Sequence, residues 1–202
     1  MAYLSGLVVR ASDQGRLVAD MESFGSDMFR EAGATQVRVM QNVMGGDQAG
    51  EINIACEWDS LDAAMRAPGD LREKQEMIDS MQAAGVQTLR RSLISIEAER
   101  GTQEGEFASL LVSSSNPHDL ATTNANLDLN WAHMQSGANG IMLGRGLAAG
   151  PLTGLRVAIT ATDSADELMA SSAAMFADPV IQQRMAEQNI QLVARQMLRL
   201  LA

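Results

Sequence analysis

The sequence predicts an α+β protein built from two copies of one β-α-β-β-α-β unit. Three observations lead to this fold class. The chain repeats itself over almost its whole length, and each copy alternates short β-type runs with helical stripes. The same strand-to-helix junction also occurs twice, as WDSLDAAM at 58–65 and as TDSADELM at 162–169. With 202 residues, the chain is long enough for two units that each bury a core.

The repeat aligns with a single gap. Residues 4–32 match 107–135 at an offset of 103, and from Gly33 and Gly137 onward the offset is 104. Matched pairs include Leu7/Leu110, Val9/Val112, Gly46/Gly150, Gly50/Gly154, Asp62/Asp166, Met81/Met185 and Arg91/Arg195. So many matches at almost one offset indicate a tandem duplication. We therefore expect domains at 1–101 and 102–202, joined by the polar segment 98–105.

Each copy begins with a strand and a helix. The runs SGLVVRAS and ASLLVSSS are typical of short strands, and apolar residues then recur at spacings of three and four. These helical stripes are Leu17, Met21, Phe24 and Met28 in the first copy and Leu120, Leu127 and Trp131 in the second. Gly33 and Gly137 are expected to end the two helices in the left-handed conformation.

A hairpin, a second helix and a last strand follow. The segments GGDQAG and AAGPLTG predict Gly-rich turns between two strands. At the repeated junction, Asp or Ser caps the next helix, and Asp62 or Asp166 places negative charge in its first turn. The runs VQTLRRSLISIEAE and IQLVARQMLRLL predict the closing strands.

The resulting order is the ferredoxin-like split motif. With about 100 residues per copy and the Trp-Asp-Ser junction after the third strand, the chain resembles the dimeric α+β barrel superfamily, which includes antibiotic-biosynthesis-type monooxygenases. The resemblance implies that two sheets face each other, so both repeats together form an intrachain α+β barrel. It also implies further pairing of whole chains into a homo-oligomer.

Composition excludes several functions. The net charge of −10 and a single lysine, Lys74, argue against nucleic acid and anionic membranes as partners. No apolar run is long enough to span a membrane. Cys56 is the only cysteine, so we expect neither disulfides nor a thiolate metal site, and a cytoplasmic location. No metal-ligand spacing, nucleophile elbow or dinucleotide fingerprint occurs, so we expect no cofactor.

The first helices of the two copies differ in polar character. By the 103 offset, Asn124 takes the place of Met21 and Trp131 that of Met28, while Thr123, Asn126, Asn130 and His133 form a polar strip. One interpretation is a pocket in the second copy with Asn124 and Trp131 facing it and His133 at its mouth. The other makes Trp131 core, Asn124 a partner of nearby backbone, and His133 a surface residue.

Arg91 and Arg195 occupy matching places in the last strands, among apolar neighbours. Arg195 is the nearest candidate for binding an acidic substituent of a ligand. Pairing of both arginines with protein carboxylates is the alternative, because a buried guanidinium must be compensated.

Three functions remain open. The first is a small-molecule-binding barrel that acts as a cofactor-independent oxygenase on an aromatic or other apolar substrate, as the resemblance implies. The second is a non-catalytic or stress-associated binding protein, and the third is a structural assembly module. Haem degradation, also found in the superfamily, requires an axial histidine on the second helix, and residues 61–84 and 165–188 contain none.

Overall fold

A computed structural model describes residues 2–202 of the chain. These residues divide into two compact units. Unit 1 comprises the chain up to Ser95 together with Leu200–Ala202, and unit 2 comprises Ile96–Arg199. The units therefore exchange short pieces of chain, since the end of the first repeat belongs to unit 2 and the last residues of the second repeat belong to unit 1.

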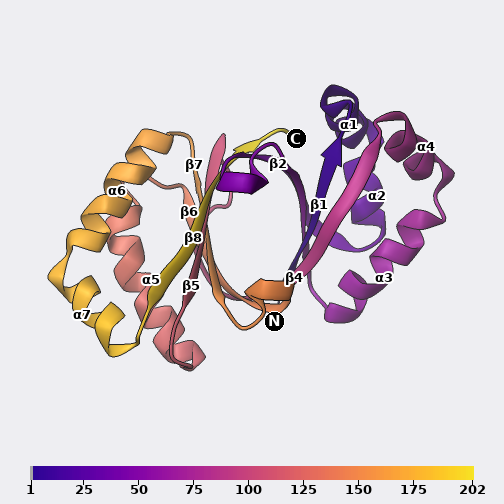
Figure 1. Ribbon diagram of the computed structural model, residues 1–202. Coiled ribbons are helices and arrows are strands. Elements are labelled where there is room, and N and C mark those ends of the chain that lie inside the picture. Colours follow the sequence, from indigo (N-terminus) through magenta and orange to yellow (C-terminus); the bar gives the residue numbers. More distant parts are fainter. Residues whose placement is uncertain (1) are drawn as a thin grey trace. The chain divides into compact units, whose positions relative to one another are not determined.

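Unit 1 is a four-stranded antiparallel sheet with helices on one face (Figure 1). Its strands, in the order β4-β1-β3-β2, are β1 (Tyr3–Ala11), β2 (Ala34–Met44), β3 (Ile52–Trp58) and β4 (Val86–Gly101). Its helices are α1 (Gln14–Asp20), a π-helical segment (Met21–Gly25), α2 (Ser26–Glu31), α3 (Leu61–Arg72) and α4 (Gln75–Ala83). A 3-10 turn, Gly46–Gln48, lies between β2 and β3.

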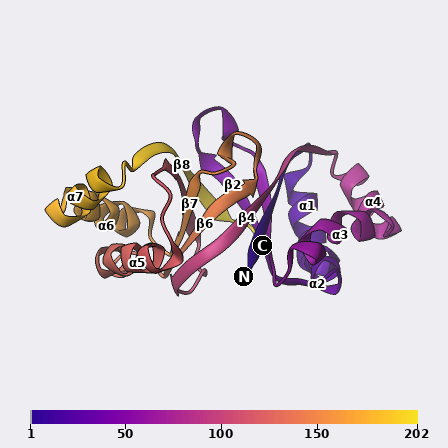
Figure 2. The same cartoon turned by 90° about the horizontal axis from the view of Figure 1, so that it is seen from below.

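Unit 2 repeats this arrangement with fewer helical breaks. Its strands, in the order β8-β5-β7-β6, are β5 (Phe107–Ser114), β6 (Gly140–Ala148), β7 (Arg156–Thr162) and β8 (Gln191–Leu200). Its helices are α5 (Leu120–Met134), α6 (Ala165–Ala177) and α7 (Pro179–Glu187), with a 3-10 turn at Gly150–Leu152. Figure 2 shows the three helices together on one side of this sheet. The predicted β-α-β-β-α-β order is confirmed in both units.

The space between sheet and helices in unit 1 is filled by one large apolar cluster. Trp58 is 2% exposed, and its indole nitrogen donates to the Ser5 hydroxyl at 2.8 Å. Ile52 and Cys56, on the same strand, are also fully buried. Burial raises the pKa of the Cys56 thiol to about 12, so the thiol stays protonated in the core.

The structure corrects the offset between the first halves of the two repeats. Tyr3 pairs with Trp58 and Phe107 pairs with Thr162, so β1 and β5 correspond at an offset of 104 (107 − 3), not 103. The helices that follow begin at the N-caps Asp13 and Asp119, an offset of 106 (119 − 13). The second repeat has a longer loop before its helix, and the first has a longer helix with a π-helical segment.

This shift changes which residues correspond on the first helices. Met21 follows its N-cap by eight residues (21 − 13), and so does Leu127 (127 − 119). Both are fully buried, at 2% and 0% exposure. Leu127, and not Asn124, therefore takes the place of Met21. The predicted exchange of an apolar for an amide side chain at this position is wrong.

The repeated turns and caps follow the sequence closely. Ser60 and Ser164 cap α3 and α6 by accepting from the backbone nitrogens of Ala63 and Glu167. Gly46 and Gly150 both have positive φ, at 63° and 56°, as a Gly-rich turn requires.

Two predictions about loops are wrong. Gly137 lacks the expected positive φ, and its glycine is needed because a Cβ there would clash with the Glu167 carbonyl oxygen. The expected linker 98–105 begins late, because β4 continues to Gly101.

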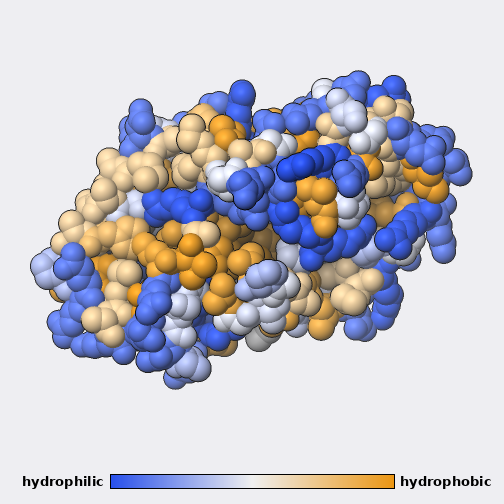
Figure 3. Space-filling view, viewed as in Figure 1, coloured by the Kyte–Doolittle hydropathy of each residue, from blue (hydrophilic) through white to orange (hydrophobic). Residues whose placement is uncertain are grey.

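Two apolar side chains at the start of β8 are exposed. Leu192 and Val193 are 49% and 56% exposed, and Figure 3 shows apolar residues gathered over this strand. None of the described helices combines the length and apolar character of a membrane-spanning segment.

Candidate functional site

A cavity lies between the sheet and the helices of unit 2, and all of its lining residues belong to that unit. Its volume is about 130 Å³, which is room for on the order of ten water molecules. The apolar part of its wall comes from strands and helices alike, and includes Leu111, Leu143, Leu168, Phe176 and Ile181. Such a wall suits the apolar body of a small organic molecule.

The charged part of the lining is entirely basic. Arg156, Arg184 and Arg195 line the cavity together with His118, and no Asp or Glu does. This contrasts with the chain as a whole, which carries a net charge of −10. Three guanidinium groups in one half-enclosed space favour an anionic group on whatever occupies it.

Arg195 is half-buried on β8 and has no carboxylate partner among the described residues. Its Nη2 donates to the Ser172 hydroxyl at 2.8 Å, its Nη1 lies 3.3 Å from the Met169 sulfur, and its guanidinium lies 5.9 Å from the Phe176 ring centroid. Burial lowers the pKa of Arg195. A partly desolvated cation held by a neutral hydroxyl and an aromatic ring keeps its full charge, and its fork geometry matches that of a carboxylate.

Arg184 is held by amides. Its Nη1 donates to the Asn126 carbonyl oxygen at 2.8 Å, and the Asn126 amide nitrogen donates to Gln188 at 2.8 Å. These bonds link α5 to α7 and fix the guanidinium at the helical wall of the cavity without neutralising its charge.

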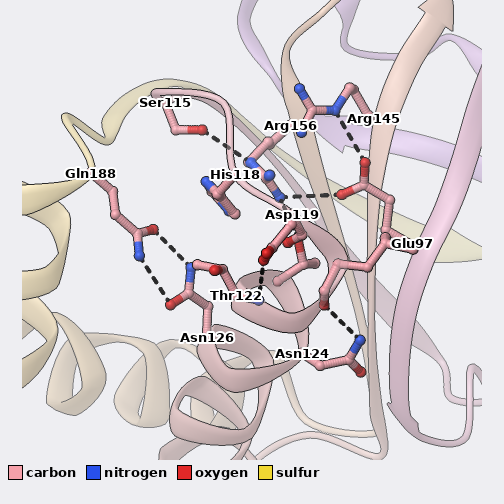
Figure 4. A network of polar contacts seen from close by, with 12 residues as sticks. Glu97, Ser115, His118, Asp119, Thr122, Asn124, Asn126, Arg145, Arg156 and Gln188 are labelled. Carbon is pink, nitrogen blue, oxygen red and sulfur yellow. Dashed lines mark hydrogen bonds and ion pairs between the residues drawn. The ribbon is translucent and has the colours of Figure 1, made fainter.

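Arg156 lies at the other side of β5 from Arg195, in a polar network (Figure 4). Its Nη1 is 3.3 Å from Glu97, which also pairs with Arg145, and its Nε donates to Ser115 at 3.0 Å. Its Nη2 is buried without a hydrogen-bond partner. One carboxylate is thus shared by two guanidinium groups, and the second nitrogen of the Arg156 fork, Nη2, is left for another acceptor.

His118 lies in the loop between β5 and α5 and faces this network. Its Nδ1 is 3.0 Å from the Asn116 carbonyl oxygen. Burial lowers the pKa of His118, and the charge of Arg156 lowers it further. The imidazole is therefore neutral at pH 7.

Two hydroxyl groups on the floor of the cavity have no hydrogen-bond partner within residues 2–202. Ser109 and Thr160 are directly opposite each other on β5 and β7, each 5% exposed. In unit 1 the position of Ser109 is held by Ser5, whose hydroxyl accepts from Trp58. Thr162 stands where unit 1 has Trp58, so the indole that would fill the space and satisfy Ser109 is missing.

The structure places the four predicted site residues in different surroundings. Only Arg195 lines the cavity. Asn124 donates to the Leu120 carbonyl oxygen at 2.9 Å and accepts from Arg100 at 3.3 Å, so its amide is satisfied within the protein.

Trp131 packs against the apolar cluster that contains Met134 and Leu168, behind the cavity wall. His133 pairs with Asp178 through Nε2 at 3.4 Å, a carboxylate that sequence spacing along its own helix does not reveal.

Sequence reasoning named Asn126 and Asn130 as part of a polar strip, and both line the cavity. The pattern did not indicate His118, Arg156 or Arg184, which also line the cavity. Two of these residues could have been found by aligning the repeats at the offset of 104. In that alignment, Arg156 replaces Ile52 and Arg184 replaces Ser80.

Comparisons with known proteins support the fold. No protein-family model matches the sequence, and no curated protein matches it either. Solved structures do match over nearly the whole chain. One is an anthrone oxidase-like protein, with a TM-score of 0.57, 13% identity and coverage of 98% of this chain and 91% of the other.

A second is a heme-binding protein from Thermus thermophilus, with a TM-score of 0.62, 7% identity and coverage of 98% and 90%. A third is a chlorite dismutase variant from Candidatus Nitrospira defluvii, with a TM-score of 0.61, 7% identity and coverage of 100% and 91%. At these identities the likeness shows the fold alone. Together with the strand order within each unit, it confirms the predicted α+β class of two tandem ferredoxin-like repeats.

The cavity of unit 2 does not fit a haem. A porphyrin is several times larger than a space for about ten waters. Helices α6 and α7 contain no histidine, and His133 on α5 is paired with Asp178.

Proposed function

We propose that unit 2 binds a small organic anion with an apolar body, and that Arg195 receives its acidic group. The observation that carries this proposal is the half-buried Arg195 guanidinium, which faces the cavity without a carboxylate partner in the described chain. The apolar wall and the three cavity arginines support the same ligand chemistry. A purely structural module gains nothing from an open space lined by uncompensated positive charge.

Benzoate is a suitable probe because it combines a carboxylate with a small aromatic body, and benzamide is its neutral counterpart. Isothermal titration should show that benzoate binds more tightly than benzamide. Replacing Arg195 by Gln should weaken benzoate binding by roughly 10- to 100-fold, the usual value of a charge-assisted hydrogen bond.

Arg91 provides the matched control. It pairs with Leu7 on β1 as Arg195 pairs with Leu111 on β5, but it is exposed and does not line the cavity of unit 2. The Arg91→Gln variant should therefore bind benzoate as the wild type does. Equal losses in both variants, or no benzoate binding by the wild type, would refute the proposed function.

A cofactor-independent oxygenase is the second candidate, supported by the apolar enclosure of the ligand body and by the likeness to a protein described as anthrone oxidase-like. In this reaction dioxygen is the oxidant and the bound substrate supplies the electrons. Oxygen uptake with an acidic quinol such as a dihydroxynaphthoate tests it. Uptake above the buffer rate that is lost in Arg195→Gln and kept in Arg91→Gln supports catalysis, whereas equal uptake by all three proteins excludes it for this probe.

A further inference from the structure

The cavity has a second polar end, formed by His118 and Arg156. A backbone carbonyl only accepts hydrogen bonds, so the 3.0 Å contact with the Asn116 oxygen assigns the hydrogen of the imidazole to Nδ1. The neutral ring then has its lone pair on Nε2. His118 therefore offers one hydrogen-bond acceptor at the edge of the cavity.

Arg156 offers a donor at the same end. Its Nε and Nη1 are used by Ser115, Glu97 and Thr123, whereas Nη2 is buried without a partner. Figure 4 shows the His118 ring beside this guanidinium. A buried donor without an acceptor is unfavourable, so an oxygen atom from a ligand would satisfy it.

The charges around His118 keep it an acceptor at neutral pH. Arg156 on β7 and Arg145 on β6 disfavour protonation, while Glu97 on β4 and the neighbouring Asp119 favour it. Burial is the largest influence and acts in the same direction as the arginines. Protonation of His118 therefore requires a pH below the ordinary range for histidine.

The two ends are separated by the width of a small molecule. Arg195 lies opposite Leu111 on one side of β5, and Arg156 lies opposite Ser113 on the other side. The strands β8 and β7 lie two strand spacings apart, and Leu111 and Ser113 are two residues apart along β5. The α-carbons of Arg195 and Arg156 are therefore separated by about 12 Å. A ligand that uses both ends must carry its two polar groups on opposite sides of its body.

We propose that the His118–Arg156 end is a subsite for a hydroxyl group, so that the ligand is a hydroxy acid with an apolar body. A hydroxyl donates to Nε2 of His118 while its oxygen accepts from Nη2 of Arg156. A second carboxylate has no hydrogen to donate to Nε2 of His118, and its negative charge would be repelled by the lone pair of that nitrogen. This inference rests on the proposed function, because it assumes that the carboxylate lies at Arg195.

The test compares ligands within each protein. At pH 7.5, 3- or 4-hydroxybenzoate should bind more tightly than benzoate, by about three- to tenfold for the added hydrogen bonds. The matching methoxybenzoate, which cannot donate, and the matching dicarboxylate should lack this gain. In His118→Phe the ratio of hydroxybenzoate to benzoate affinity should fall to about one, and His118→Gln should recover part of it through its amide oxygen.

His133 is the control, because it lies in the same unit but pairs with Asp178 and lines no cavity. His133→Phe should keep the wild-type ratio. If benzoate binds but neither hydroxybenzoate gains affinity, or the gain survives in His118→Phe, the hydroxyl subsite is refuted while the proposed function stands. If no benzoate binds, the proposed function itself fails.

Discussion

The two repeats share a fold but differ in how the space between the sheet and the helices is filled. In unit 1 the space between sheet and helices is filled, with Trp58, Ile52 and Cys56 all at most 2% exposed. In unit 2 the corresponding residues of β7 are Thr162, Arg156 and Thr160, and the last two of these line a cavity. A duplicated unit can thus keep one copy as a packed core while the other exchanges apolar volume for polar groups that line a cavity.

The arginines on the closing strands show the same contrast with identical side chains. Arg91 and Arg195 have matching partners on the neighbouring strand, Leu7 and Leu111. Arg91 is exposed, whereas Arg195 is half-buried beside Ser172 at the cavity. Burial lowers the pKa of both guanidinium groups. Residue type and strand position are also the same, so the cavity beside Arg195 is what distinguishes the two arginines.

The largest expected effect comes from removing a large side chain from the core of unit 1. Trp58→Ala removes the central side chain of its core and leaves the Ser5 hydroxyl without its donor. We expect the free energy of unfolding to fall by about 3–5 kcal/mol, the range for large aromatic truncations. Denaturant unfolding measures it, and a loss below about 1 kcal/mol would contradict the description of unit 1 as the filled repeat.

Filling unit 2 is the reverse experiment. In Thr162→Trp, an indole in the Trp58 orientation would reach Ser109 and occupy the cavity floor. Benzoate at 100 times its dissociation constant should stabilise the wild type by about 2.7 kcal/mol and this variant not at all. Thr162→Val is the control, since it also loses the hydroxyl that bonds Gly137 and Ser164 but leaves the space open. Ligand stabilisation that persists in Thr162→Trp would place the ligand elsewhere.

The helix caps should show no difference between the repeats. Ser60 and Ser164 make the same bond at the start of α3 and α6. Each Ser→Ala variant should lower the free energy of unfolding by about 1 kcal/mol. A loss confined to one repeat would show that the junctions are equivalent in sequence but not in energetics.

The smallest expected effect concerns pH. Both histidines lie in the second repeat, and the folded protein lowers the pKa of His118. As the pH falls, the imidazole of His118 is therefore protonated in the unfolded chain before it is protonated in the folded protein. The free energy of unfolding is highest above about pH 6.5 and decreases as the pH falls below that value. The ring is partly exposed, so the effect is screened and small. His118→Gln should flatten the stability profile between pH 7.5 and 5, and an unchanged slope would contradict the assigned pKa shift.

Much of the fold could be predicted from the sequence, because hydrophobic periodicity and cap residues act locally. The Ser60 and Ser164 caps and the glycine turns follow from this local chemistry. The helix register could not be predicted. The second repeat has a longer loop before its helix, and the first repeat has a longer helix with a π-helical segment. These two differences in length nearly cancel, so an alignment with a single gap does not reveal either of them. Leu127 consequently replaces Asn124 as the counterpart of Met21.

The site was only partly predictable for a related reason. Arg195 was found because it repeats in sequence as Arg91. His118 and Arg156 come together only through the pairing of β5 with β7, and the partner of His133 comes from a separate segment. Contacts between segments that are distant in the sequence leave no periodic pattern in it. They can be found only from the positions of the side chains in the folded structure.

The most direct test of the central claim, that unit 2 and not unit 1 binds a small organic anion, is a benzoate titration followed by two-dimensional NMR of the ¹⁵N-labelled protein. The backbone amides of Leu111, Ser172 and Arg195 should shift with a common saturation curve, while those of Leu7 and Arg91 stay in place. Shifts at Leu7 and Arg91 of equal size, or no saturable shift at Arg195, would contradict the claim.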